Sequence, residues 1–169
     1  MLTPNQEKYL QAIPEDKVIH IQPFNPKVRE SAKEIISQIK GKLPDLGVFF
    51  GGASALGIAG QNDIDLNILS VPEEYDKHLP ILKELFGEPT KTSFSLVEWE
   101  FKRNGFDVEL YLTDRNSSAL QEQIKTFEIL RDNPGYRKKY EQIKLSSDSL
   151  SFREYMRRKY EFFSRLIQD

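Results

Sequence analysis

The chain has 169 residues, of which 38% are hydrophobic and 30% charged, and its formal net charge is −2 at pH 7. This length forms one ordinary domain with a sizeable core, and the near-neutral charge argues against a general nucleic-acid binder. The absence of cysteine excludes disulfides and thiolate chemistry, and the two histidines, His20 and His78, lack the spacing of zinc ligands.

The N-terminal half begins with a segment that alternates enough to predict an early strand, Lys17–Phe24. Asn25-Pro26 then indicates the start of a helix, with proline in its first turn. Apolar residues recur at helical spacing up to Gly41. They are Val28, Ala32, Ile35, Ile36 and Ile39. No signal-peptide pattern precedes this region and no run approaches the ~20 apolar residues of a membrane helix, so we expect a cytoplasmic protein.

The most informative stretch joins a glycine turn to an acidic strand. A short apolar strand is predicted over Leu46–Phe50, followed by Gly51-Gly52, and a second strand over Asp63–Leu69. Alternation in the second strand separates two faces. One face carries Asp63, Asp65 and Asn67, and the other carries Ile64, Leu66 and Ile68. Residues two apart on a strand lie about 7 Å apart, a spacing that suits one or two hydrated Mg²⁺ ions.

The middle of the chain predicts a helix and then a hairpin. Apolar residues at helical spacing run from Tyr75 to Phe86 and end at Gly87. Asn104-Gly105 predicts a two-residue turn between strands over Phe94–Arg103 and Phe106–Leu112. With that turn, Lys102 faces Asp107 and Glu100 faces Glu109.

Beyond the hairpin the pattern becomes helical, over roughly Ser117–Arg131, Pro134–Leu145 and Ser149–Ile167. Mixed strands and helices with a hairpin predict an α+β fold, a mixed β-sheet packed with helices plus a C-terminal helical segment. We expect residues 1–115 to form the core and residues 116–169 a helical extension packed on it as one structural domain. From Arg131 to Arg165 there are ten Lys and Arg against five Asp and Glu, a surplus that suits either a polyanionic substrate or a solvated face.

The acidic strand and the glycine turn together suit nucleotidyl transfer, which needs a phosphate cradle, metal ions and an aligned acceptor. Gly51 and Gly52 would let backbone amides approach the triphosphate, and Ser54 would add a hydroxyl donor at the start of a short helix. Asp63 and Asp65 would hold Mg²⁺ or Mn²⁺. The alternative is that both aspartates are ordinary polar residues on the wet face of a strand.

A third carboxylate completes such a site, and Asp107 is the candidate for that ligand and for the general base. It could instead pair with Lys102 on an exposed hairpin. Five further side chains are candidate substrate contacts or solvated surface groups. They are Glu109, Lys102, Arg103, Arg153 and Arg157.

These residues carry a resemblance. Phe50-Gly51-Gly52, followed after ten residues by Asp63-Ile64-Asp65-Leu66, resembles the signature of the DNA polymerase β-like nucleotidyltransferase superfamily, and Phe106-Asp107-Val108 is similar to its third-carboxylate strand. From about residue 17 the chain resembles the GrpB-like branch of that superfamily. Val18–Pro26 is similar to its opening strand, Gly51–Gly60 to its small-residue loop, and Tyr136–Phe162 to its helical tail. The chain departs from the pattern in having glycine at position 52, where serine is commoner, and acids at 107 and 109, where many GrpB-like chains have histidines.

The resemblance implies a nucleotidyltransferase-like fold and a metal-dependent transfer of a nucleoside monophosphate from a nucleoside triphosphate to an unknown acceptor. A non-catalytic nucleotide-binding or adaptor domain of the same fold is the alternative, favoured by Gly52 and by the lack of an obvious acceptor pocket. A metal-dependent phosphohydrolase uses similar carboxylates but usually adds histidines. We expect no membrane partner, and nucleic acid stays open as an acceptor although the net charge does not indicate it.

Overall fold

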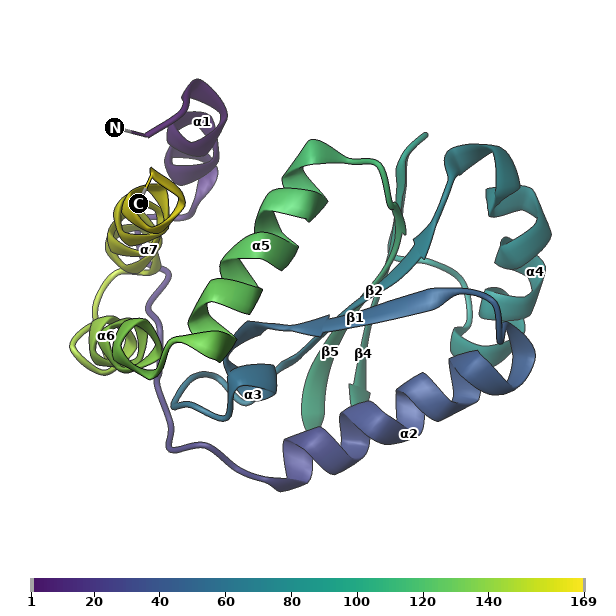
Figure 1. The fold of residues 1–169 in the computed structure, drawn as a ribbon, viewed down its shortest axis with the longest axis horizontal. Helices are drawn as coiled ribbons and strands as arrows, with labels where there is room; N and C mark the ends of the chain where they lie inside the picture. The colour runs from purple at the N-terminus through teal and green to yellow at the C-terminus, as the bar shows by residue number, and fades with distance from the viewer. Residues whose placement is uncertain (1, 169) are drawn as a thin grey trace.

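The structure is a computed structural model that describes residues 2–168. A five-stranded mixed sheet lies at its centre, with helices on both faces (Figure 1). In chain order the elements are α1 (Pro4–Ala12), α2 (Lys27–Lys42), β1 (Gly47–Gly51), α3 (Gly52–Leu56), β2 (Ile64–Ser70), the 3-10 helix η1 (Pro72–Glu74), α4 (Tyr75–Phe86), β3 (Lys91–Thr92), β4 (Leu96–Arg103), β5 (Phe106–Asp114), α5 (Ser118–Asp132), α6 (Pro134–Leu145) and α7 (Phe152–Gln168). The predicted α+β fold with a mixed sheet and C-terminal helices is confirmed.

The strands follow the order β1-β2-β5-β4-β3, and only β2 and β5 run parallel. The predicted turn at Asn104-Gly105 joins β4 to β5, and both residues have positive φ, 53° and 84°, as a tight hairpin turn of this kind requires. The predicted register is also confirmed, with Lys102 opposite Asp107 and Glu100 opposite Glu109. The Asn104-Gly105 pair therefore predicted both the β4–β5 hairpin and its register.

The apolar face of the sheet carries the main core. Helices α2 and α4 cover this face, as Figure 1 shows. Their buried side chains pack against fully buried residues of the three central strands, among them Ile64, Leu66, Ile68, Leu110 and Leu112. The predicted alternation of β2 is confirmed, since its aliphatic residues all enter this core and its acidic face points the other way.

The opposite, polar face is covered only in part. Helix α5 packs against the β1 edge, where Phe127 meets Phe49 edge-to-face at 5.3 Å between ring centroids. Helices α6 and α7 stand beyond α5, and a second apolar cluster joins α3, α5, α6 and α7. Because this cluster lies at one end of the polar face, the rest of that face borders a cleft.

The N-terminal region differs from the prediction. The strand predicted over Lys17–Phe24 is wrong: this segment is extended but forms only isolated bridges, Val18 with Ser151 and Gln22 with Gly60. It runs between α1 and α2 alongside the start of α7 and the loop after α3, away from the sheet edges. Helix α1 was not predicted, because its nine residues have little amphipathic pattern and it depends on packing against α7.

None of the helices in the described part of the chain combines the length and the apolar composition that crossing a bilayer requires.

Candidate functional site

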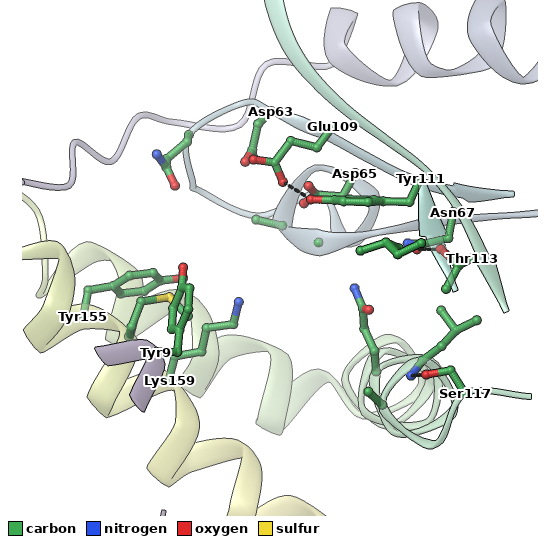
Figure 2. Close-up of a pocket in the computed structure, with 18 of the residues that line it drawn as sticks. Tyr9, Asp63, Asp65, Asn67, Glu109, Tyr111, Thr113, Ser117, Tyr155 and Lys159 are labelled. Atoms are coloured by element: carbon green, nitrogen blue, oxygen red, sulfur yellow. Dashed lines mark hydrogen bonds between the residues drawn. The ribbon is translucent and has the colours of Figure 1, made fainter. Parts of the chain in front are cut away.

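A cleft of about 840 Å³ lies between the polar face of the sheet and the helices α5, α6 and α7. This volume is in the range of small-molecule sites and is large enough for a nucleotide. Acidic and amide side chains form the sheet wall, and lysine and tyrosine side chains form the facing helical wall (Figure 2). The two walls of the cleft therefore differ in charge.

Three carboxylates gather on the sheet wall: Asp63, Asp65 and Glu109. Alternation along β2 turns Asp65 away from its fully buried neighbours Ile64 and Leu66. The parallel pairing of β2 with β5 places Asp65 directly opposite Glu109. Two carboxylates on neighbouring strands thus point into the same space, with Asp63 one step before β2.

The loop that carries Asp63 is held by α6 and by the extended segment before α2. The Ala59 backbone N–H donates to Glu141 of α6 at 2.8 Å. Gly60 exchanges backbone hydrogen bonds with Gln22 at 2.8 and 3.0 Å. Asn62, which has a φ of 51°, donates to the carbonyl of Pro23 at 3.1 Å and accepts from the Asn25 N–H at 3.0 Å. These contacts fix where the chain enters β2.

Crowding of the carboxylates changes their protonation. Burial raises the pKa of Asp65 to about 8, and the charges of Asp63 and Glu109 and a hydrogen bond with Glu109 contribute to this rise, against the opposing charge of Lys159. Burial and the charge of Glu109 raise the pKa of Tyr111, whose hydroxyl stays protonated and donates to Glu109 at 3.0 Å. The site therefore holds more carboxylates than its surroundings can keep ionised at neutral pH.

Gly52 lies against the crowded aspartate. Its φ is +78°, and a Cβ placed there would be 2.6 Å from the Asp65 Oδ2. Gly52 and Ala53 line the cleft, so this part of the turn borders the acidic cluster. Any side chain at position 52 would be strained and would also displace the Asp65 carboxylate.

Asp107, the predicted third ligand and base, lies elsewhere. Its side chain is 73% exposed and accepts a hydrogen bond from Lys102 at 2.6 Å on the surface of the hairpin. It does not line the cleft, whereas Glu109, two residues further along β5, does. Both acids share one face of β5, and the offset of the β2–β5 pairing brings Glu109 rather than Asp107 beside Asp65.

The predicted nucleotide contacts Gly51 and Ser54 do not line the cleft. Gly51 is the last residue of β1, where it packs under Phe49. Ser54 is 2% exposed, lies inside the five-residue helix α3, and its hydroxyl has no hydrogen-bond partner among residues 2–168. Only Gly52 of the predicted cradle residues borders the cleft.

The predicted substrate contacts Lys102, Arg103, Arg153 and Arg157 also lie outside the cleft. Arg103 donates to Gln38 of α2 at 2.9 Å. Arg157 pairs with Glu7 at 3.2 Å, and Arg153 donates to the carbonyl of Ile13 at 2.5 Å. Arg153 and Arg157 therefore tie α7 to the N-terminal region.

The sequence prediction missed the cationic wall. Lys144, which is 6% exposed, donates to the Tyr155 hydroxyl at 2.7 Å, and the Tyr140 hydroxyl lies 3.4 Å from that oxygen. Burial by itself would raise the pKa of Tyr155, but the charges of Lys159 and Lys144 outweigh it and the pKa is lowered. Lys159 lines the cleft one helical turn after Tyr155. The spacing of Tyr155 and Lys159 by four residues was the available signal, although such pairs are common on helices.

Comparison with known proteins places the chain in a family. The family model described as "GrpB protein" matches residues 18–169. The chain belongs to the GrpB family. This confirms the predicted resemblance, and a search of curated proteins finds no match to this GrpB chain.

Two of the solved structures that are similar to the GrpB chain illustrate the extent of the match. One is a structure of Cid1, titled for its RNA terminal uridylyl transferase activity, with 13% identity and a TM-score of 0.45, covering 80% of this chain and 45% of that one. Another is the GLD-2/RNP-8 complex, with 14% identity and a TM-score of 0.41, covering 81% of this chain and 60% of that one. The GrpB chain spans about half the length of the Cid1 structures that it matches.

The contact between Gly52 and Asp65 predicts a stability difference between two glycines of positive φ. We expect Gly52→Ala to lower the free energy of unfolding by about 2 kcal/mol or more, from backbone strain plus displacement of Asp65. Gly105→Ala is the matched control, because Gly105 has a φ of +84° and a Cβ added there would meet nothing within 4 Å. Urea unfolding measures both. Equal losses at the two positions would show that the contact with Asp65 costs nothing, and Asp65→Ala should relieve the excess at position 52.

The raised pKa of Asp65 predicts that Asp65→Asn stabilises the metal-free protein, increasingly so as pH rises. The Asp65 carboxyl has a pKa of about 8 in the folded state and 3.8 in the unfolded chain. The free energy of unfolding of the protein therefore falls as pH rises between these values. The slope is at most about 1.4 kcal/mol per pH unit, and the asparagine variant lacks it. Urea unfolding with chelator at pH 5 and pH 8 tests this, with the exposed Asp107→Asn as control. An advantage of Asp65→Asn that does not grow with pH would contradict the raised pKa.

Proposed function

We propose that this GrpB chain is a metal-dependent nucleotidyltransferase that moves a nucleoside monophosphate from a nucleoside triphosphate to an acceptor hydroxyl. One observation carries the proposal: three carboxylates on the sheet wall face the lysines of α6 and α7 across a cleft of nucleotide size. Metal-bound phosphates need anionic ligands for the metal and cationic groups for the phosphate oxygens. The cleft offers both, on opposite walls.

The donor set suits Mg²⁺ or Mn²⁺, both of which prefer carboxylate oxygen. As placed, no three His, Cys, Asp or Glu side chains within residues 2–168 form a metal-binding group. The fit rests instead on chemistry: the charges of Asp63 and Glu109 help to raise the pKa of Asp65, and a divalent cation would relieve that repulsion. When bound, the metal would neutralise the phosphates and polarise the one under attack. Asp65 would bind it only after losing its proton.

Lys144 and Lys159 would contact the triphosphate. Among the described residues, neither lysine forms an ion pair with a carboxylate within 4.0 Å. Lys144 instead donates to Tyr155, and its ammonium lies over the rings of Tyr140 and Tyr155 at 5.1 and 5.0 Å. A charge held at this depth without a carboxylate partner gains most from an anionic ligand. Phosphate oxygens would supply that charge.

Glu109 replaces Asp107 in the proposed chemistry. It lines the cleft beside Asp65 and accepts from Tyr111, while Asp107 is on the surface with Lys102. Glu109 would complete the carboxylate set and accept the proton of the acceptor hydroxyl. Gly52 would let the backbone approach the phosphates without a side chain between them.

Binding of ATP with Mg²⁺ tests the carboxylate assignment. By isothermal titration we expect Asp65→Asn to weaken Mg²⁺-dependent binding about tenfold or more, because one charged ligand is lost from a partly buried site. Asp107→Asn, the matched control on the same strand face as Glu109, should bind as wild type does. If Asp65→Asn binds as tightly as wild type, the metal role is wrong. If Asp107→Asn is the variant that fails, Asp107 rather than Glu109 is the third carboxylate.

Lys159→Met tests the cationic wall. The variant keeps the length and the apolar stem but removes the charge, so we expect about tenfold weaker ATP binding, the loss of one charge-assisted hydrogen bond. Lys138→Met on the exposed surface of α6 is the control for a general charge effect. The salt dependence of the affinity should fall for Lys159→Met alone. Equal affinity of the two variants would mean that the triphosphate does not meet the lysine wall.

A nucleotide-binding or adaptor role without turnover is the second candidate. It is favoured by the absence, among residues 2–168, of a group already arranged to hold a metal. Labelled triphosphates mixed with a range of acceptors separate the two functions. Transfer that is lost in Asp65→Ala excludes the adaptor, whereas tight ATP binding with no transfer supports it.

A further inference from the structure

Asn67 is a buried side chain whose amide faces the cleft. It lies two residues beyond Asp65 on the same face of β2, is 6% exposed, and lines the cleft. Its Oδ1 accepts a hydrogen bond from the Thr113 hydroxyl at 2.8 Å. The Nδ2 donates no hydrogen bond to any residue from 2 to 168. This nitrogen is not among the fully buried polar atoms of residues 2–168, so its free donor is open to a ligand or to water in the cleft.

Thr113 sets the direction of that amide. Its hydroxyl, on β5, points to the carbonyl oxygen of Asn67, and this hydrogen bond turns the amide nitrogen toward the cleft. Thr113 is itself 8% exposed, so both partners of this hydrogen bond are buried. The sheet thus presents a fixed hydrogen-bond donor about 7 Å along β2 from Asp65.

The end of the cleft around Asn67 carries different polar groups from the end around Lys159. Figure 2 shows Asn67, Thr113 and Ser117 at one end and Tyr155 and Lys159 at the other. Ser117 donates its backbone N–H to the carbonyl of Asp114, and both residues line the cleft. The Asn67 end of the cleft therefore offers an amide, hydroxyls and one carboxylate.

All the lysine side chains that line the cleft lie at the opposite end, near Tyr155 and Phe152. Lys17 lies over the ring of Phe152 at 4.2 Å, Lys144 contacts Tyr155, and Lys159 follows Tyr155 by one turn of α7. A polyanion would find no counter-charge beside Asn67 and would meet the charge of Asp114. Neutral hydroxyl groups, or hydroxyls together with an ammonium group, match this end in both hydrogen bonding and charge.

We propose that the Asn67 end of the cleft binds the acceptor, and that the acceptor is a small polyhydroxylated molecule, neutral or amine-bearing, of the carbohydrate class. The role of this molecule as acceptor rests on the proposed nucleotidyltransferase function. The binding site itself does not depend on that function. Asn67 donates to an acceptor oxygen, Asp114 accepts from a hydroxyl or ammonium group, and Thr113 is a positioning residue. The triphosphate takes the lysine end.

Ligand-observed saturation-transfer NMR tests the site with two probes, glucose and glucosamine, on the full chain. Glucose 6-phosphate and a hexa-adenylate oligonucleotide serve as anionic comparators. Each is measured without nucleotide and again with Mg²⁺ and a non-hydrolysable ATP analogue. We expect saturation transfer from the wild-type protein to at least one of the two sugars. That sugar should bind about fivefold more weakly to Asn67→Ala, because one neutral hydrogen bond is lost. ATP affinity by titration calorimetry should stay unchanged.

Thr113 provides the test that separates positioning from mere folding. Thr113→Val keeps the shape and removes the hydroxyl, so the sugar should bind less well, whereas Thr113→Ser keeps the hydroxyl and should restore binding. If Asn67→Ala unfolds, these two variants carry the test. Equal loss in valine and serine variants overturns the positioning role.

Other outcomes overturn the acceptor class. Binding of hexa-adenylate or glucose 6-phosphate that depends on Asn67, with no binding of either sugar, shows an anionic acceptor. Sugar binding that is the same in wild type and Asn67→Ala shows that the contact lies elsewhere. If ATP fails to bind but glucosamine binding depends on Asn67, the site stands and the nucleotidyltransferase function fails.

Discussion

The enforced proximity of Asp63, Asp65 and Glu109 on a partly buried sheet face is the constraint on which the rest of the site depends. It is imposed by the sheet, because the parallel pairing of β2 with β5 sets Asp65 beside Glu109 and leaves neither strand free to move away. On the reverse face Ile64, Leu66 and Ile68 are fully buried against α2 and α4. The apolar core thus holds the three carboxyl groups close together, and burial together with the charges of Asp63 and Glu109 raises the pKa of Asp65 to about 8. Gly52 is part of the same constraint, since it leaves room for the Asp65 oxygen.

The C-terminal helices supply the opposite charge. Lys159 partly offsets the crowding of Asp65, and Lys144 and Tyr155 share a hydrogen bond on the same wall. These side chains can face the sheet only if α7 is held in place. The Arg157–Glu7 pair and the bond from Arg153 to the carbonyl of Ile13 join α7 to the N-terminal region. The arginines therefore support the cleft from behind, although they do not line it.

The sequence determined the fold well where a local pattern carried the information. Asn104-Gly105 fixed the hairpin and its register, and the alternation of β2 fixed which residues enter the core. It could not decide between Asp107 and Glu109. Both point to one face of β5, and the choice depends on the offset between two strands that are 36 or more residues apart in sequence, which no local signal encodes. Lys144 and Lys159 were missed for the same reason, because a lysine that lines a cleft has the same local sequence pattern as a solvated one.

The cleft also has a direction, and β2 defines it. Asp63, Asp65 and Asn67 follow one another along a single face, at intervals of about 7 Å for successive pairs. The charge of the wall changes along that line, from carboxylates facing the lysines to an amide held by Thr113. In the proposed function, a triphosphate attracted to the lysines would place its reactive phosphorus near Asp65, and the remaining space would lie toward Asn67. An attacking oxygen must approach the phosphorus opposite the leaving pyrophosphate. The strand proposed to bind the metal would therefore also set the side from which the acceptor arrives.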